Sequence, residues 1–207
     1  MTPRIREMQT RPANLSCLDR FLDGSLNVLA AGEIAPHKNH ERLLDAFAIY
    51  HCTYNRHSRL LIVGRHRRDC IMYLRAVRHR IRRWGLAEAV SLASNVSDEV
   101  WKSYYLCADL FFDTSRPAGI SLPLLEAMSW KIPVLAVDSP GVRATVGASG
   151  LVWEDSDPES LAACLHRLAC DEELRCQLGQ MGWQRAQGFF RRRKTHGRLL
   201  HSVEVAQ

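Results

Sequence analysis

A lysine stands where a helix is expected to begin after a buried strand. The segment 31–41 runs from apolar residues through Gly32 to Lys38, and an amphipathic helical pattern follows it. A helix N-terminus attracts anions through its free N–H groups and partial positive charge, and a lysine there adds a full charge. Lys38 is therefore a candidate phosphate ligand, and a solvated lysine near a helix cap is the alternative. We interpret the neighbouring His37 and His40 as polar loop or capping residues rather than ligands.

A second segment, residues 115–134, places a glycine and a carboxylate at another strand-to-helix turn. Gly119 allows a ligand to approach the backbone closely. Glu126 lies one turn inside a helix that a proline starts. A carboxylate in that position can accept hydrogen bonds from both hydroxyl groups of a ribose. On spacing alone, a surface glutamate is the favoured interpretation and a ribose ligand is the alternative.

The elements that position these residues alternate in type from residue 26 onward. Apolar runs predict strands at 27–31, 59–63, 89–93, 109–113, 133–137 and 150–153. Amphipathic patterns predict helices at 39–54, 70–84, 98–107, 123–130 and 142–147, another from 157 to about 169, and a further one after it. This order predicts an α/β, doubly wound, Rossmann-like domain with a parallel sheet of about six strands and a helical carboxyl end.

Such a sheet binds ligands at the carboxyl ends of its strands. The loops expected to carry the site are therefore 32–38, 64–69, 94–98, 114–123 and 138–143. The nucleotide-binding motifs GxGxxG and GxxxxGK[ST] are absent from the sequence. Their absence argues against a plain dehydrogenase or a P-loop enzyme.

The charge of the chain predicts an anionic partner. The net charge is +6, and residues 65–83 contain eight arginines against the single acid Asp69. Arg75, Arg78 and Arg82 recur at helical spacing, which fits a solvated helix face or, as a second interpretation, contact with anionic lipid. Nucleic acid is the least favoured partner, because no RRM, zinc or helix-turn-helix pattern accompanies the arginines.

The seven cysteines form no CxxC pair and no zinc-like spacing with histidine. We therefore expect a reduced, cytoplasmic protein without a metal site. The first residues lack the apolar stretch of a signal peptide, and no run approaches the roughly 18 apolar residues of a membrane span. Any membrane contact is expected to be peripheral, at the inner face of the cell membrane.

Several stretches together resemble a known family. They are NVLAAGEIAPHKNHE (27–41), RLLIVG (59–64), VSDE (96–99), ADLFF (108–112), GISLPLLEAM (119–128) and PVLA (133–136). In this order they resemble the carboxyl-terminal, nucleotide-sugar-binding domain of retaining GT-B fold glycosyltransferases. This is the group 1 family of glycosyl transferases, which includes glycogen synthases and bacterial polysaccharide mannosyltransferases. The resemblance covers about residues 26–190.

The resemblance implies a nucleotide-diphosphate sugar as donor substrate, with no separate cofactor and no metal. It implies that Lys38 is catalytic and contacts the diphosphate, that the backbone N–H groups of 119–122 bind it, that Glu126 binds the ribose, and that the loop near Val96 touches the base. The implied donor-binding residues are Gly32, Glu33, Lys38, Val96, Gly119, Ile120, Ser121, Leu122 and Glu126. The implied chemistry is hexose transfer with retention, in which the leaving phosphate helps to deprotonate the acceptor and cations stabilise the departing diphosphate.

Four positions depart from the family's pattern. Glu33 replaces a usual arginine, Ala118 and Ala144 replace glutamates, and Ser94 replaces a glycine. Two unit charges about 5 Å apart interact by roughly 3 kcal/mol at an effective dielectric near 20. Exchanging attraction for repulsion at Glu33 doubles that figure, which is about four orders of magnitude in donor affinity. We expect a nearby cation, Arg65 or Arg116, to compensate for it.

Three parts are expected along the chain: an amino-terminal extension (1–25), the GT-B nucleotide-sugar-binding domain (26–190) and a basic carboxyl tail (191–207). Enzymes of the family close a cleft between two such domains, so an acceptor domain or subunit is an expected partner. The expected function is transfer of a hexose to a glycan or lipid-linked acceptor. The alternatives are a catalytically degenerate binding or scaffold module and, third, a basic nucleic-acid-binding or membrane-surface protein.

Overall fold

The computed structural model describes residues 12–154 and 157–204. Within them lies one six-stranded, fully parallel sheet with the strand order β3-β2-β1-β4-β5-β6. The strands are β1 (Leu26–Glu33), β2 (Ser58–Arg65), β3 (Val90–Ser94), β4 (Leu110–Asp113), β5 (Val134–Val137) and β6 (Leu151–Trp153). A strand is present at every predicted position, and the predicted Rossmann-like sheet is confirmed.

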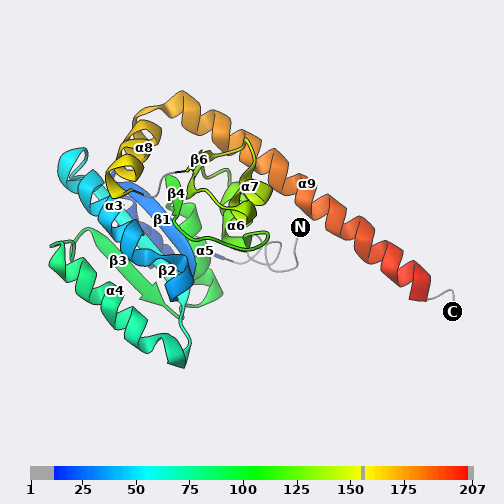
Figure 1. Ribbon diagram of the computed structural model, residues 1–207, viewed down its shortest axis with the longest axis horizontal. Coiled ribbons are helices and arrows are strands. Elements are labelled where there is room, and N and C mark those ends of the chain that lie inside the picture. Colours follow the sequence, from blue (N-terminus) through cyan, green and yellow to red (C-terminus); the bar gives the residue numbers. More distant parts are fainter. Residues whose placement is uncertain (1–11, 155–156, 205–207) are drawn as a thin grey trace.

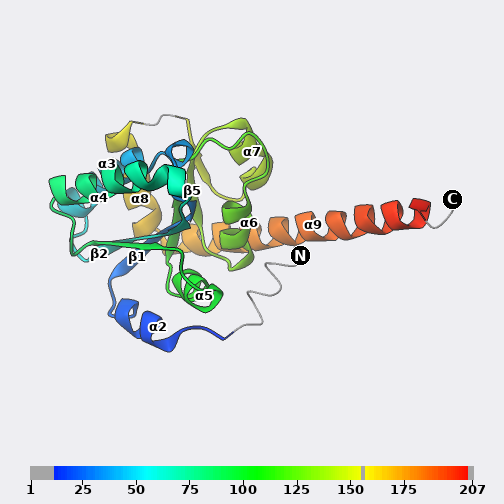
Figure 2. The same cartoon turned by 90° about the horizontal axis from the view of Figure 1, so that it is seen from below.

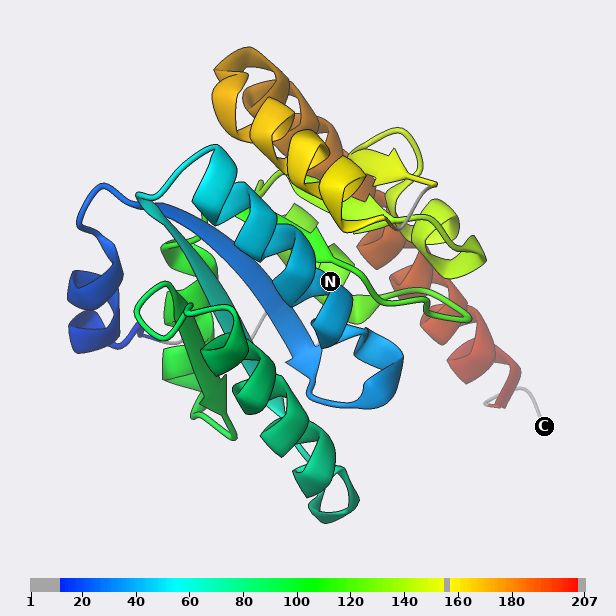
Figure 3. The ribbon, with the colours of Figure 1, turned by 60° about the vertical axis from the view of Figure 1, so that its left-hand side comes forward.

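Helices cover both faces of this sheet (Figures 1 and 2). They are α2 (Leu15–Phe21), α3 (His40–Thr53), α4 (Ile71–Arg83), α5 (Asp98–Leu106), α6 (Leu122–Ser129), α7 (Pro140–Val146), α8 (Pro158–Cys170) and α9 (Glu172–Glu204), with short 3-10 turns η1 (Pro36–Lys38) and η2 (Arg68–Cys70). Figure 3 shows α8, in yellow, lying beside α3 on one face. The long helix α9 crosses the other face and then projects away from the sheet (Figure 1).

The four central strands, β2, β1, β4 and β5, are largely buried on both faces, because successive side chains point to opposite sides and helices cover each side. In β1, Val28 and Ala30 belong to the core that includes residues of α3, α4 and α8, whereas Leu29 belongs to the core that includes residues of α2, α5, α6, α7 and α9. In β4, Phe112 joins the first core and Phe111 the second. This double burial explains why the strands appear in the sequence as continuous apolar runs.

Helices α2 and α9 lie at the two ends of the expected nucleotide-sugar-binding domain (26–190). Part of the expected amino-terminal extension forms α2, whose Phe21 is buried in the second core, and the N–H of Asn14 donates to Ser103 Oγ in α5 at 2.8 Å. At the other end, α9 continues through residues 190 and 191 without a break. The side chains of 192–194, in the expected basic tail, lie outside the described residues.

The strand order determines where a ligand can bind. The connections run outward in opposite directions from β1 and β4, which are neighbours in the sheet. Loops leaving their carboxyl ends therefore diverge to opposite faces and leave a crevice between them. Lys38 follows β1 and the segment 114–123 follows β4, so the sheet brings both predicted ligand-binding segments to this crevice.

Candidate functional site

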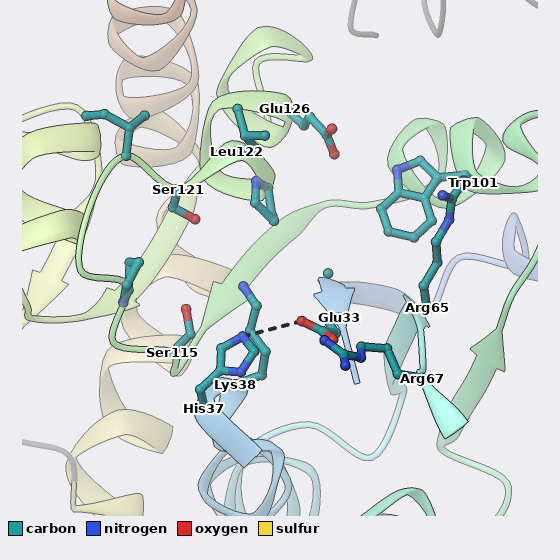
Figure 4. A pocket seen from close by; sticks show the side chains of 14 residues that line it. Glu33, His37, Lys38, Arg65, Arg67, Trp101, Ser115, Ser121, Leu122 and Glu126 are labelled. Atoms are coloured by element: carbon teal, nitrogen blue, oxygen red, sulfur yellow. Dashed lines mark ion pairs between the residues drawn. The ribbon is translucent and has the colours of Figure 1, made fainter. Parts of the chain in front are cut away.

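A cavity of about 550 Å³ opens above the carboxyl ends of β1, β2 and β4 (Figure 4). Pockets of roughly 300–1,000 Å³ commonly hold small-molecule ligands. The lining combines cations, hydroxyl groups, a buried carboxylate and one indole ring. It consists of Gly32, Glu33, His37, Lys38, Arg65, Arg67, Trp101, Ser115, Pro117, Ile120, Ser121, Leu122, Pro123 and Glu126.

Lys38 is held by its backbone at one side of the cavity. It ends the η1 turn, and the next residue, Asn39, adopts a left-handed conformation with φ 53° before α3 begins. Thr114 Oγ1, after β4, donates to the carbonyl oxygens of Lys38 and Asn39 at 3.2 and 3.0 Å. These bonds join the two loops of the crevice and fix the point from which the lysine side chain starts.

The absence of a side chain at Gly32 leaves space for the side chain of Lys38. A Cβ atom at Gly32 would lie 3.1 Å from Lys38 Cε and 3.2 Å from Lys38 Nζ, and the glycine φ of +144° is itself unfavourable for L side chains. The ammonium group therefore lies against the bare Cα of Gly32, close to Pro123 at the start of α6. The structure thus brings together three elements that favour an anion: Gly32, Lys38 and a helix N-terminus.

The loop before α6 meets the cavity differently from the prediction. Ile120, Ser121 and Leu122 line it, whereas Gly119 is exposed and outside the lining. The N–H of Ser121 was expected to face a ligand, but it donates to Thr145 Oγ1 at 3.0 Å. Ser121 instead contributes its side chain to the cavity wall.

Glu126 is buried, with 3% of its surface exposed, and it lines the cavity. The interpretation of Glu126 as a surface glutamate is therefore wrong. The hydroxyl of Tyr105, in α5, donates to Glu126 Oε2 at 2.8 Å, and the Tyr105 ring stacks on Phe111 of β4. This contact from a neighbouring helix holds the carboxylate in a defined orientation.

The opposite side of the cavity carries charges of both signs. Glu33 and Arg65 are register partners at the ends of β1 and β2, and both line the cavity with Arg67. The closest ion pair described for Glu33 is with His37 Nε2 at 3.9 Å, while Arg65 lies 3.9 Å from Asp98. Of the two cations expected to offset Glu33, Arg65 lines the cavity and Arg116 does not.

Two further residues lie apart from the cavity: Val96, expected near the base, and His40, interpreted as a polar loop or capping residue. Val96 packs against the second core and is not part of the lining. His40 is buried in α3, where Tyr73 accepts a hydrogen bond from its backbone N–H at 3.0 Å, and burial lowers the His40 pKa to about 4. His40 is thus a neutral structural residue at pH 7.

The structure also adds residues that the sequence analysis missed. Trp101, Ser115 and Arg67 line the cavity. Trp101 comes from α5, one turn after the loop that was expected to touch a base, and Figure 4 places its indole ring opposite Lys38. The only sequence signals for these residues were their positions within or just after the loops at the strand ends.

The described residues offer neither a membrane-spanning helix nor a metal-binding cluster. No helix among them is long and apolar enough to cross a bilayer. In the same part of the chain, no three His, Cys, Asp or Glu side chains gather closely enough to hold a metal ion.

The fold and the cavity together define a Rossmann-like α/β domain with an anion-attracting site at its topological switch point. The chain belongs to the family described as glycosyl transferases group 1, whose model matches residues 25–171. Its sheet and flanking helices match those of GT-B glycosyltransferases.

Individual relatives agree with this assignment. The chain is 29% identical over 167 residues to the amylovoran biosynthesis glycosyltransferase AmsD of Erwinia amylovora, covering 80% of this chain and 45% of AmsD. It superimposes on sucrose-phosphate synthase from Thermosynechococcus elongatus with a TM-score of 0.80 at 22% identity, covering 97% of this chain and 51% of that one. Anabaena HepE, solved in complex with UDP and glucose, gives a TM-score of 0.79 at 18% identity, with 96% and 55% covered. The chain thus spans about half the length of these proteins.

Proposed function

We propose that this chain is the donor-binding, carboxyl-terminal domain of a retaining glycosyltransferase. It takes a hexose from a nucleoside-diphosphate sugar and transfers it to a glycan or lipid-linked acceptor. A second domain or subunit holds the acceptor. The observation that carries the proposal is that Lys38, the N-terminus of α6 and the buried Glu126 line one cavity at the switch point. The binding of UDP and glucose by HepE, a structural neighbour, supports it.

Each part of the cavity has a role in this proposal. Lys38 and the α6 N-terminus hold the diphosphate, where negative charge grows as the sugar leaves. Glu126 accepts hydrogen bonds from the ribose hydroxyl groups. Trp101 forms the apolar wall on the nucleoside side. In the reaction, the acceptor oxygen bonds to the anomeric carbon as the bond from that carbon to the diphosphate breaks. Attack on the same face retains the configuration, and the departing diphosphate takes the acceptor's proton.

Calorimetry on the purified chain tests the donor site. UDP, GDP, ADP and their common hexose conjugates are titrated at two salt concentrations. We expect one nucleotide to bind most tightly. Its affinity should fall at the higher salt concentration, because salt screens the attraction between exposed charges. Glu126→Gln should weaken this binding, whereas Glu88→Gln, an exposed glutamate outside the cavity, should not. Absence of binding at millimolar ligand would contradict the donor site.

A catalytically degenerate binding module is the second candidate. Two departures from the family's pattern favour it: Glu33, in place of an arginine, lines the cavity, and position 118, where the family has a glutamate, is an exposed alanine. The two candidates share nucleotide binding and differ in chemistry. Release of free hexose or of a glycosylated acceptor from the bound donor, in the presence of the acceptor domain, distinguishes the enzyme from the binding module.

The basic face of α4 is proposed to meet an anionic membrane surface. Arg75, Arg78 and Arg82 are exposed, and α4 contains no acidic residue. Vesicles with anionic lipid should co-sediment the chain at low salt, and the triple change of these arginines to glutamine should abolish the effect. Equal sedimentation of the wild type and the triple variant would show that this face of α4 does not bind the membrane.

Tyr105→Phe should weaken UDP binding about fivefold because Glu126 loses the hydrogen bond that orients it. A loss of overall stability alone would lower affinity for every ligand equally. The informative readout is therefore the ratio of affinities for UDP and 2′-deoxy-UDP. This ratio should fall towards one in the variant, while pyrophosphate affinity stays constant; an unchanged ratio would contradict the positioning role.

Glu33→Gln should strengthen nucleoside-diphosphate binding about five- to tenfold, because it removes a negative charge from the cavity lining. The Glu33 side chain is 37% exposed, so solvent screens part of the roughly 3 kcal/mol of repulsion expected at a dielectric near 20. Calorimetry with Glu88→Gln as the charge-matched control measures the effect. Weaker binding in Glu33→Gln would mean that the carboxylate accepts a hydrogen bond from the ligand.

A further inference from the structure

Two serine hydroxyl groups in the cavity wall have no hydrogen-bond partner among the described residues. Ser115, just after β4, is 1% exposed, and Ser121, just before α6, is 4% exposed. Both side chains line the cavity. Buried hydroxyl groups are nearly always hydrogen-bonded, because leaving one unsatisfied costs free energy. Two such groups in one wall therefore require an explanation.

Backbone contacts hold both serines in place. The N–H of Ser115 donates to Asp113 Oδ1 at 2.8 Å. The N–H of Ser121 donates to Thr145 Oγ1, which itself donates to the carbonyl oxygen of Gly141 at 2.6 Å. These bonds use the backbone N–H groups and leave the side-chain oxygens on the cavity side, where Figure 4 shows them on the same side as Lys38.

The packing of the loop against α7 makes this arrangement rigid. A Cβ atom at Gly141 would lie only 2.3 Å from the carbonyl oxygen of Pro117 and 2.4 Å from that of Gly119. The loop backbone thus rests directly on α7, and Ser121 cannot rotate its N–H into the cavity without breaking this contact. At this position the hydroxyl group is the only donor that Ser121 can offer a ligand.

We propose that the hydroxyl groups of Ser115 and Ser121 are ligand donors that bind oxygen atoms of a diphosphate. An anion is the partner that fits, since Lys38 and the N-terminus of α6 share the same cavity and favour negative charge. A hydroxyl group donates strongly to a charged oxygen. The inference rests on the proposed function for the nucleoside part of the ligand; the diphosphate part is tested separately below.

The test uses the full chain with two probes, UDP and inorganic pyrophosphate. Ser115→Ala and Ser121→Ala should each raise the Kd of both probes about tenfold, the size of a lost hydrogen bond to a charged group. The ligand-free variants should melt no lower than the wild type, because each change removes an unsatisfied buried group.

Ser58→Ala is the matched control. Ser58 is 4% exposed, but its Oγ donates to the carbonyl oxygen of Asn55 at 2.6 Å, far from the cavity lining. This variant should melt at a lower temperature and bind both probes like the wild type. A melting temperature that falls in Ser58→Ala but not in Ser115→Ala or Ser121→Ala separates a structural hydroxyl group from a ligand donor.

Each outcome decides a claim. Pyrophosphate binding that the serine variants leave unchanged overturns the inference, and it leaves the proposed function standing if UDP still binds. Serine-dependent pyrophosphate binding without binding of any nucleoside diphosphate overturns the proposed function and supports the inference. Absence of binding of both probes to the wild type overturns both. A lower melting temperature in Ser115→Ala and Ser121→Ala, with unchanged affinity for both probes, would show that the hydroxyl groups stabilise the fold and do not bind the ligand, which also overturns the inference.

Discussion

Replacing Lys38 with alanine is expected to weaken nucleoside-diphosphate binding about 100-fold. Two unit charges 4 Å apart attract each other by about 4 kcal/mol at an effective dielectric of 20. Water replaces part of that attraction in the variant, which leaves about 2–3 kcal/mol, or two orders of magnitude in Kd. The ammonium group lies against Gly32 beside the first turn of α6, so nearby N–H groups add to its potential.

The fold should tolerate this change. Lys38 is held through its backbone: its carbonyl oxygen accepts a hydrogen bond from Thr114 in the other loop, and its N–H donates to the carbonyl oxygen of Ala35 in its own turn. Lys102→Ala is the matched control, because this lysine lies over the Trp130 ring and outside the cavity lining. Calorimetry should therefore show a large loss of affinity in Lys38→Ala, a shallower salt dependence and an unchanged melting temperature. Equal affinities of Lys38→Ala and Lys102→Ala for the nucleoside diphosphate would show that Lys38 does not bind the ligand.

The fold was predictable because its signal is repeated. The central strands are buried on both faces, so apolar runs such as Leu60 to Val63 mark them in the sequence, and turn residues mark their ends. The helix α2 carried no such signal. It is short, and it is held by burial of Phe21 and by the contact of Asn14 with Ser103, which lies 89 residues away in the chain. Contacts at that separation leave no periodic pattern in the sequence.

The site was predictable as far as backbone position determines it. Gly32 lies at the end of β1, and Lys38 and Glu126 follow β1 and β4, so strand order alone brings the three residues to one crevice. Side-chain direction was not predictable. Whether Ser121 presents its N–H or its hydroxyl depends on Thr145, in a helix two elements further along the chain. Trp101 likewise enters the cavity through the packing of α5 against the sheet.

Gly64→Ala is expected to destabilise the chain by about 3 kcal/mol, which corresponds to a fall of about 6–12 °C in melting temperature for a domain of this size. A Cβ atom at Gly64 would lie 2.2 Å from the carbonyl oxygen of Gly32 and 2.8 Å from Ile34 Cγ1. Neither strand can move aside easily, because the N–H of Ile34 donates to the carbonyl oxygen of Arg65 at 2.8 Å. The atom nearest to the new methyl group is thus a backbone oxygen, which cannot rotate away as the end of a flexible side chain can.

The same change should reach the site through Gly32. Any shift of β1 away from β2 moves the residue against which the Lys38 ammonium group lies. Folded Gly64→Ala protein should therefore also bind UDP more weakly. Gly119→Ala is the control, since a Cβ atom there meets nothing within 4 Å, and its stability should change by less than about 0.5 kcal/mol. Urea unfolding measures both variants. Equal midpoints for Gly64→Ala and the wild type would show that the ends of β1 and β2 can separate at little cost in free energy. In that case the close pairing of Gly32 with Gly64 does not determine the position of Lys38.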